Sequence, residues 1–186
     1  MPYRKQPIVR GNYYHIYNRG NNRENIFFED RNYEFFIRRI KENFPGYAEL
    51  VTYCLMPNHF HLIAYIISDK DFYKALRKTF ISYTKAINQF LGRTGHLFEG
   101  RYKYKLVPEN NYLLHLSRYI HLNPVRAGLV DKPGKWRYSS YLTYIGKQKD
   151  DFIKNGIILE QVKDYEDFVI KFQEEQNYFV KPLMFG

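Results

Sequence analysis

The sequence predicts an α+β domain in which one antiparallel sheet packs against helices, and three observations lead to this prediction. Segments rich in aromatic and aliphatic residues alternate with segments whose apolar residues recur every three or four positions. Short stretches with proline, glycine or asparagine separate these segments and predict turns. The 186 residues, of which 45% are hydrophobic and 26% charged, are enough for one domain with a full hydrophobic core.

The first strand is predicted over residues 13–19, where aromatic residues dominate. Asp30 can cap a helix that runs to about residue 43, because apolar residues recur along one face of this segment. Pro45 and Gly46 should end that helix.

Residues 47–56 and 59–67 predict two further strands, which the Pro57-Asn58 turn joins as a hairpin. Asp71 opens a second helix that runs to about residue 91. Its apolar residues, like those of the first helix, fall roughly on one side, so we expect both helices on one face of the sheet.

Residues 101–107 alternate basic with aromatic or aliphatic residues, as a strand with one solvated face does. A third helix is predicted over residues 110–123, and Pro124 should end it, because proline disfavours a helical conformation in the residue before it. The order is therefore β-α-β-β-α-β-α, and its first six elements form a ferredoxin-like, split βαβ unit.

Charge divides the chain near residue 147. Residues 1–146 carry a net charge of +12 and residues 147–186 a net charge of −2. The basic part favours a polyanionic partner, nucleic acid before an anionic membrane surface, although a basic surface without any partner is the alternative. We therefore assign residues 1–146 to one domain and residues 147–186 to a C-terminal tail.

The tail contains one predicted helix. Its apolar residues follow a helical spacing over Tyr165, Phe168, Val169 and Phe172. Two placements are open for it: packing on the core, which we favour, or lying over the basic surface in imitation of nucleic acid.

Three further features bound the class of protein. The N-terminus lacks the apolar core of a signal peptide, and no apolar stretch reaches membrane-spanning length. The single cysteine, Cys54, excludes an intramolecular disulfide and a cysteine-rich zinc site, and its apolar surroundings predict a core residue. We expect a cytoplasmic, nucleoid-associated protein with no membrane partner.

Two histidines, His59 and His61, begin the third predicted strand. Side chains alternate along a strand, so both imidazoles point to one face and Phe60 points the opposite way, into the core. Two imidazoles on one face can bind a single divalent cation. The alternative is a pair of hydrogen-bonded histidines at a strand edge.

The third predicted helix offers further candidates. His115, Tyr119 and Asn123 recur every four residues and form one stripe along the helix. The adjacent stripe is apolar and should dock on the sheet; its members are Leu113, Leu116 and Ile120. Tyr119 is therefore expected at the margin between core and solvent, and His96 and His121 on the surface or behind the site.

Four segments of the sequence match the motifs of a known family: YHIYNRG, YCLMPNHFH, GHLFEGRYK and LSRYIHLNPVRAGLV. A fifth segment, WRYSSY, extends the match. In this order the chain resembles the single-tyrosine HUH transposases, and within them the REP-associated tyrosine transposases. The resemblance covers about residues 10–145. It implies an HUH-type sheet with the histidine pair on a central strand.

Carried over to these positions, the resemblance implies His59 and His61 as metal ligands, Asn123 as the residue that completes the metal site, and Tyr119 as the nucleophile. The implied cofactor is Mg²⁺ or Mn²⁺. The implied enzyme is an endonuclease and strand transferase that acts on single-stranded, hairpin-containing DNA through a 5′-phosphotyrosine link. A free phenol has a pKa of about 10, so a base is needed; His115 and a water on the cation are the candidates.

Two basic segments are candidates for DNA binding: the loop over residues 19–23 and the strand over residues 101–107. On the strand over residues 101–107, basic side chains should face phosphates and Tyr102 and Tyr104, on the other face, could stack on bases. The alternative is a solvated edge strand protected by charge. The candidate contact residues in the two segments are Arg19, Asn21, Asn22, Arg23, Arg101, Lys103 and Lys105.

Other functions remain as alternatives. One is a catalytically inactive protein of the same fold that binds hairpin DNA or RNA. Another is an RNA-binding sheet protein, against which the histidines count, because such sheets expose aromatic residues there. A monomer and a homodimer are both open, and in a dimer Tyr119 of one chain would face the histidines of the other.

Overall fold

The computed structural model describes residues 7–108 and 110–171. The four strands are β1 (Tyr13–Arg19), β2 (Ala48–Met56), β3 (His59–Ile66) and β4 (Lys103–Val107). The three long helices are α1 (Asp30–Asn43), α2 (Phe72–Phe90) and α3 (Asn110–Arg126). Shorter helices follow, namely α4 (Tyr141–Tyr144), α5 (Gly156–Leu159) and α6 (Tyr165–Lys171). None of the helices in the described ranges is long and apolar enough to cross a membrane.

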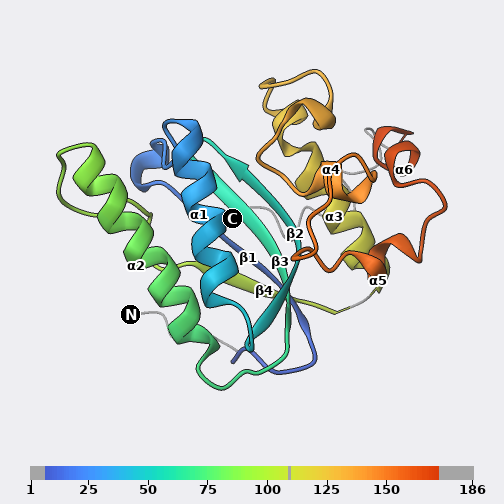
Figure 1. The fold of residues 1–186 in the computed structure, drawn as a ribbon, viewed down its shortest axis with the longest axis horizontal. Helices are drawn as coiled ribbons and strands as arrows, with labels where there is room; N and C mark the ends of the chain where they lie inside the picture. Colours follow the sequence, from blue (N-terminus) through green and yellow to red (C-terminus); the bar gives the residue numbers. More distant parts are fainter. Residues whose placement is uncertain (1–6, 109, 172–186) are drawn as a thin grey trace.

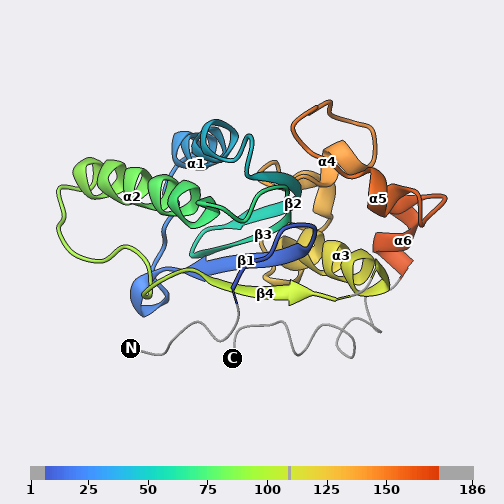
Figure 2. The same ribbon diagram turned by 90° about the horizontal axis from the view of Figure 1, so that it is seen from below.

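The strands form one antiparallel sheet in the order β2-β3-β1-β4. This order and the βαββαβ sequence of elements confirm the predicted split βαβ unit. The histidine-bearing strand β3 is central, because it pairs with β1 on one side and β2 on the other (Figures 1 and 2).

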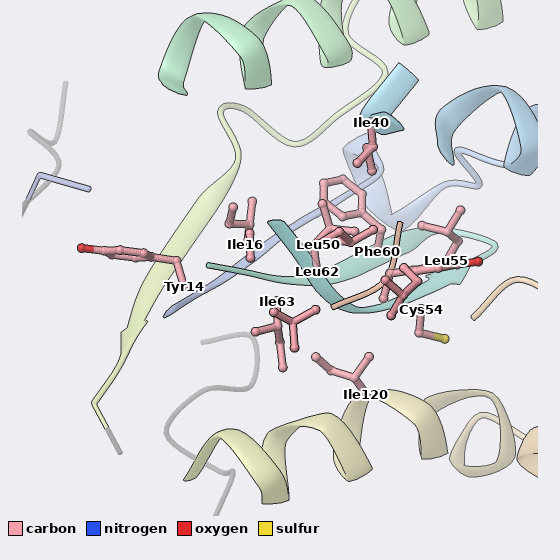
Figure 3. Packing of buried hydrophobic residues seen from close by; sticks show 14 of the residues in the cluster. Tyr14, Ile16, Ile40, Leu50, Cys54, Leu55, Phe60, Leu62, Ile63 and Ile120 are labelled. Carbon is pink, nitrogen blue, oxygen red and sulfur yellow. The ribbon is translucent and has the colours of Figure 1, made fainter. Parts of the chain in front are cut away.

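Helices α1 and α2 lie on one face of the sheet, as expected, and α3 lies on the opposite face (Figure 1). Figure 3 shows Ile40 of α1 on the side of Phe60 and Leu62, and Ile120 of α3 on the side of Ile63. The alternation of β3 explains the difference, because Leu62 and Ile63 point to opposite faces and both are fully buried. Phe60 points into the core, as predicted.

Two helix ends differ from the prediction. Glu29, not Asp30, caps α1, and it forms a capping box with Asn32. Helix α3 continues through Pro124 to Arg126. A proline removes one backbone donor, but the following turn still bonds, since Ala127 N–H donates to the Asn123 carbonyl at 2.9 Å.

The segment after α3 folds back on the sheet and on α3. Backbone hydrogen bonds join it to β2: Leu55 N–H donates to Tyr138 O at 2.9 Å and Ser140 N–H to Tyr53 O at 3.0 Å. This segment therefore covers the β2 edge. The described part of the tail, including α6, packs on the core, as we favoured, while Phe172 lies outside the described residues. The boundary after residue 146 stays a prediction.

Candidate active site

The two histidines of β3 lie side by side on the sheet face that α3 covers. His59 is opposite Arg19 and His61 is opposite Tyr17 in the β1–β3 register. Their ring centroids are 5.1 Å apart and the rings are edge to face. Two imidazoles that bind one ion through nitrogens about 2 Å from it have centroids about 5 Å apart, so the spacing suits a shared cation.

Asn58 fixes the tautomer of His59. The Asn58 Nδ2 group donates to the Arg23 carbonyl at 3.1 Å, which leaves Oδ1 to face His59. His59 Nδ1 lies 2.7 Å from that oxygen and must therefore carry the hydrogen. The lone pair of this imidazole is on Nε2, and Nε2 is the nitrogen through which His59 can ligate a cation.

His15 of β1 holds the second histidine. His15 Nε2 lies 2.8 Å from His61 Nδ1, and both side chains are buried. With Nδ1 in this hydrogen bond, His61 can ligate a cation only through Nε2, and then His15 accepts the Nδ1 hydrogen. A histidine ligand usually donates its other ring N–H in this way. His15 was not among the candidates predicted from the sequence; the available signal was a third histidine, on a strand adjacent to the pair.

Burial keeps all three imidazoles neutral, the form that binds metals. It lowers the pKa of His15 to about 3 and that of His59 to about 4, with smaller contributions from the charges of Lys105 and Arg19 respectively. Burial also lowers the pKa of His61 well below its ordinary value, and the neighbouring His15 and His59 add to this shift.

Tyr119 of α3 lies next to His61, one histidine of this pair. Its ring centroid is 6.1 Å from that of His61, in an edge-to-face arrangement. The side chain is only 5% exposed, so the expectation of a residue at the margin between core and solvent was wrong. Ser117 and His121, on the outer face of α3, are also buried. The C-terminal segment covers this face of the helix. His121 is therefore not a surface residue.

Arg126 extends the candidate site by one residue that the sequence analysis missed. Its guanidinium carbon lies 5.1 Å from the centroid of the Tyr119 ring. Burial raises the pKa of Tyr119, and the positive charge of Arg126 opposes this rise. The available signal was spacing, since Arg126 follows Tyr119 by two helical turns.

Asn123 lies one turn after Tyr119 and is buried. Its Nδ2 atom has no hydrogen-bond partner among the described residues. Turning the amide over presents Oδ1 instead, which is a metal ligand of the kind that Mg²⁺ and Mn²⁺ accept. In residues 7–108 and 110–171, no group of three or more His, Cys, Asp or Glu side chains could hold a metal ion. Among these residues, a third ligand beside His59 and His61 would be of another type, and the amide of Asn123 is the candidate that the sequence suggested.

His115, the candidate base, occupies a different place. Its Nδ1 lies 2.8 Å from a guanidinium nitrogen of Arg118, and its ring centroid is 5.9 Å from that of Phe168 in α6. His115 thus lies against the C-terminal segment. His96 is exposed in the loop before β4.

The predicted DNA-binding residues of β4 face the candidate site. Lys103 is opposite Tyr17 and Lys105 is opposite His15 in the β1–β4 register, so they share the sheet face of the histidines. Arg101 is exposed just before the strand. The tyrosines between them are less suited to stacking on bases than expected. Both pack on the core: Tyr102 lies 5.3 Å from Phe80 and Tyr104 6.0 Å from Tyr14, centroid to centroid.

The basic loop after β1 forms a tight turn beside His59. Arg19 forms an ion pair with Glu99, which leaves its charge partly neutralised. Asn22 and Arg23 are exposed and adopt left-handed conformations, with φ of 53° and 61°. Asn21 is half-buried. Arg23 also reaches the site through its carbonyl, which binds Asn58.

Comparison with known proteins places this geometry in a family. Residues 8–123 match the family model described as "Transposase IS200 like", and the match covers more than half of the chain. The chain belongs to the IS200-like transposase family. Members of this family are typically DNA-cleaving enzymes. The matched range includes His59, His61, Tyr119 and Asn123 and ends at the last of them.

Two relatives refine the family assignment. A protein of Haemophilus influenzae, named as a REP-associated tyrosine transposase, is 27% identical over 111 residues, which are 54% of this chain. The chain spans 61% of the length of that relative. A solved structure of a REP-associated tyrosine transposase bound to a REP hairpin has a TM-score of 0.66 at 18% identity. It covers 82% of this chain and 93% of its own, and it shows that the fold is shared.

Proposed function

We propose that this IS200-like transposase is a metal-dependent endonuclease and strand transferase that acts on single-stranded, hairpin-containing DNA. The observation that carries the proposal is the contact between Tyr119 and His61, with a centroid distance of 6.1 Å. It unites a phenol with two neutral imidazoles on one buried sheet face. The family match supports the same reaction class.

In the proposed reaction, Tyr119 Oη attacks the phosphorus of a backbone phosphodiester. The bond from phosphorus to the 3′ oxygen breaks, the phenolic proton is released, and the 3′ oxygen leaves and takes up a proton. The DNA is then linked to Tyr119 through its 5′ phosphate. Because this link is still a phosphodiester, a 3′-hydroxyl of another strand can reverse the step and join a new strand.

We propose His59, His61 and Asn123 as the residues that hold the divalent cation, Mg²⁺ or Mn²⁺. When bound, such an ion supplies positive charge next to the scissile phosphate. The residues of the chain orient the donors: Asn58 fixes His59 and His15 fixes His61. Arg126 favours the phenolate of Tyr119 through its charge.

The proposed DNA path follows the basic side chains around this site. Lys103 and Lys105 are on the histidine face of β4 and would contact phosphates. Other proposed contacts come from the turn at the end of β1 and the start of β4, namely Arg19, Asn21, Asn22, Arg23 and Arg101. A hairpin partner is supported by the REP hairpin in the solved relative. We propose residues 1–146 as the catalytic domain.

The test is covalent trapping. Labelled single-stranded hairpins from DNA flanking the gene are incubated with the protein and Mn²⁺ or Mg²⁺, and the products are separated on a denaturing gel. We expect a metal-dependent, protein-sized labelled band that is absent in Tyr119→Phe. The matched control is Tyr112→Phe, which removes a hydroxyl from the same helix that has no hydrogen-bond partner among the described residues. This control should form the adduct at the rate of the unaltered protein.

Hairpin binding without an adduct under either metal would contradict the proposed reaction. It would favour the alternative of a hairpin-binding protein in which the histidines no longer support catalysis. An adduct that persists in Tyr119→Phe would place the nucleophile elsewhere in the chain.

A further inference from the structure

A buried chain of hydrogen bonds lies on the side of α3 that faces away from the histidines. His121 follows Tyr119 by two positions, so its side chain points to roughly the opposite side of the helix. The imidazole is fully buried and both nitrogens are engaged. His121 Nδ1 lies 2.9 Å from Tyr165 Oη of α6, and Nε2 lies 2.8 Å from Ser140 Oγ.

The direction of these hydrogen bonds follows from Ser117, the last residue in the series of hydrogen bonds. Ser117 Oγ donates its hydrogen to the Leu114 carbonyl at 2.8 Å, so it accepts from Tyr165 Oη, which is 2.8 Å away. Tyr165 must then accept from His121 Nδ1. His121 Nε2 therefore has the lone pair and accepts from Ser140 Oγ at 2.8 Å. The Tyr53 carbonyl is a second acceptor within reach of the Ser140 hydroxyl, but at 3.3 Å it is the more distant one.

Ser140 ties this chain to the sheet. Its Oγ accepts the backbone N–H of Tyr53 in β2 at 2.9 Å, and its own N–H donates to the Tyr53 carbonyl at 3.0 Å. In the series Ser140, His121, Tyr165 and Ser117, each side-chain donor is thus used once. These hydrogen bonds link β2, α3 and α6. A shift or rotation of α3 would leave at least one buried polar group without its partner, which is unfavourable.

We propose that His121, Ser140 and Tyr165 form a clasp that positions Tyr119 against the histidines of its own chain. The proposal rests on the proposed function, because it assigns these three as positioning residues for the attack by Tyr119. Ser140 and Tyr165 lie beyond residue 123, where the family match ends, so the C-terminal segment supplies a part that the matched region lacks. The clasp makes the site complete within one chain.

Two tyrosines provide a matched test of the clasp. Tyr165 and Tyr141 are both buried, with exposed fractions of 4% and 1%, and their ring centroids lie 5.7 Å and 5.5 Å from that of His121. They differ in hydrogen bonding: the Tyr141 hydroxyl has no partner among the described residues, whereas Tyr165 bonds His121 and Ser117. Tyr165→Phe removes clasp bonds, and Tyr141→Phe makes the same chemical change without doing so.

Three measurements are made on the full chain. The first is hydrogen exchange of the α3 amides by mass spectrometry. The second is the affinity for a labelled hairpin. The third is the rate of adduct formation at saturating hairpin in a single turnover. For Tyr165→Phe we expect faster α3 exchange, a hairpin Kd within about twofold of the unaltered protein, and an adduct rate lower by about 10- to 100-fold, because a small displacement of a reacting group costs this much. Tyr141→Phe should leave all three unchanged.

Ser140→Ala breaks the clasp at its other end and should reproduce the effects of Tyr165→Phe, including the unchanged Kd. A general loss of folded protein would instead weaken binding and adduct formation together. Equal exchange and equal adduct rates in Tyr165→Phe and Tyr141→Phe would overturn the proposal.

A mixing experiment tests the statement that the site lies within one chain. Tyr119→Phe is combined with a His59→Ala, His61→Ala double variant, and the mixture should form no adduct. Recovery of adduct would mean that α3 reaches the histidines of a partner chain, which also overturns the proposal. If the unaltered protein forms no adduct, the proposed function fails, and the exchange comparison still decides whether the clasp holds α3.

Discussion

At the scale of single residues, each histidine of the pair is held by a different neighbour. Asn58 dictates the tautomer of His59, because its own amide is fixed by the Arg23 carbonyl. His61 depends on His15, and that contact crosses from β3 to β1. Hydrogen bonds to other residues, and not between the two histidines, thus orient both imidazoles for a cation.

The first prediction concerns His15. Replacement His15→Phe keeps an aromatic ring in the buried site but removes the acceptor for His61 Nδ1–H. We expect the affinity for Mn²⁺, measured by electron paramagnetic resonance titration, to fall by about tenfold, since such supporting partners are worth 10- to 100-fold. His96→Ala, at an exposed position, is the control and should bind Mn²⁺ normally. Unchanged affinity in His15→Phe would mean that His61 does not need this acceptor.

At the scale of elements, the turn between β1 and α1 is packed tightly beside the site. Gly20 donates its N–H to the Asn58 carbonyl at 2.8 Å, which brings the turn to the β2–β3 hairpin. A Cβ on Gly20 would lie 1.9 Å from the Glu24 carbonyl oxygen. The turn therefore requires glycine for close approach of two backbone segments, and not for an unusual φ.

We expect Gly20→Ala to lower the free energy of unfolding by about 1–3 kcal/mol, the usual cost of overpacking, as measured by urea denaturation. Gly156→Ala is the matched control. A Cβ there meets only the Glu160 side chain at 3.9 Å, so the stability should stay within about 0.5 kcal/mol. Equal midpoints for the two variants would contradict the prediction, and would mean that the Glu24 backbone moves aside easily.

At the scale of the whole molecule, the basic side chains of β4 and the C-terminal segment lie in different places around α3. The basic side chains of β4 lie on the histidine face of the sheet. The C-terminal segment, whose sequence over residues 147–186 carries a net charge of −2, packs in its described part on α3 and the β2 edge, away from β4. The β4 side of the histidine face is thus the surface that suits a polyanion.

This arrangement predicts the salt dependence of hairpin binding. Replacing Lys103 and Lys105 together by alanine should weaken binding and reduce the slope of log K against log salt by about 1 to 2, because each phosphate contact contributes about 0.7 to 0.9. Fluorescence anisotropy at several salt concentrations measures the slope. The control replaces Lys149 and Lys163, exposed residues of the tail, and removes the same net charge. If both double variants change the slope equally, the effect is one of net charge and not of the β4 surface.

Much of the fold followed from the sequence. Local patterns located all four strands, the long helices and the Pro57-Asn58 hairpin to within about two or three residues, because hydrophobic periodicity and turn residues act over short distances. The two-residue period of a strand also put His59 and His61 on one face. The family motifs led to Tyr119 and Asn123, whose roles in catalysis and metal binding remain proposals.

Only the tertiary structure decided what surrounds these residues. Helical spacing predicted a half-exposed Tyr119, but the side chain is buried, with His61 of β3 beside its ring and the Arg126 guanidinium over it. The pairing of His15 with His61 and the clasp on His121 likewise join residues from separate elements. Such contacts depend on how elements pack, and periodicity within one element gives no information about them. The sequence thus determined the fold and the candidate residues, and the packing decided their tautomers, burial and support.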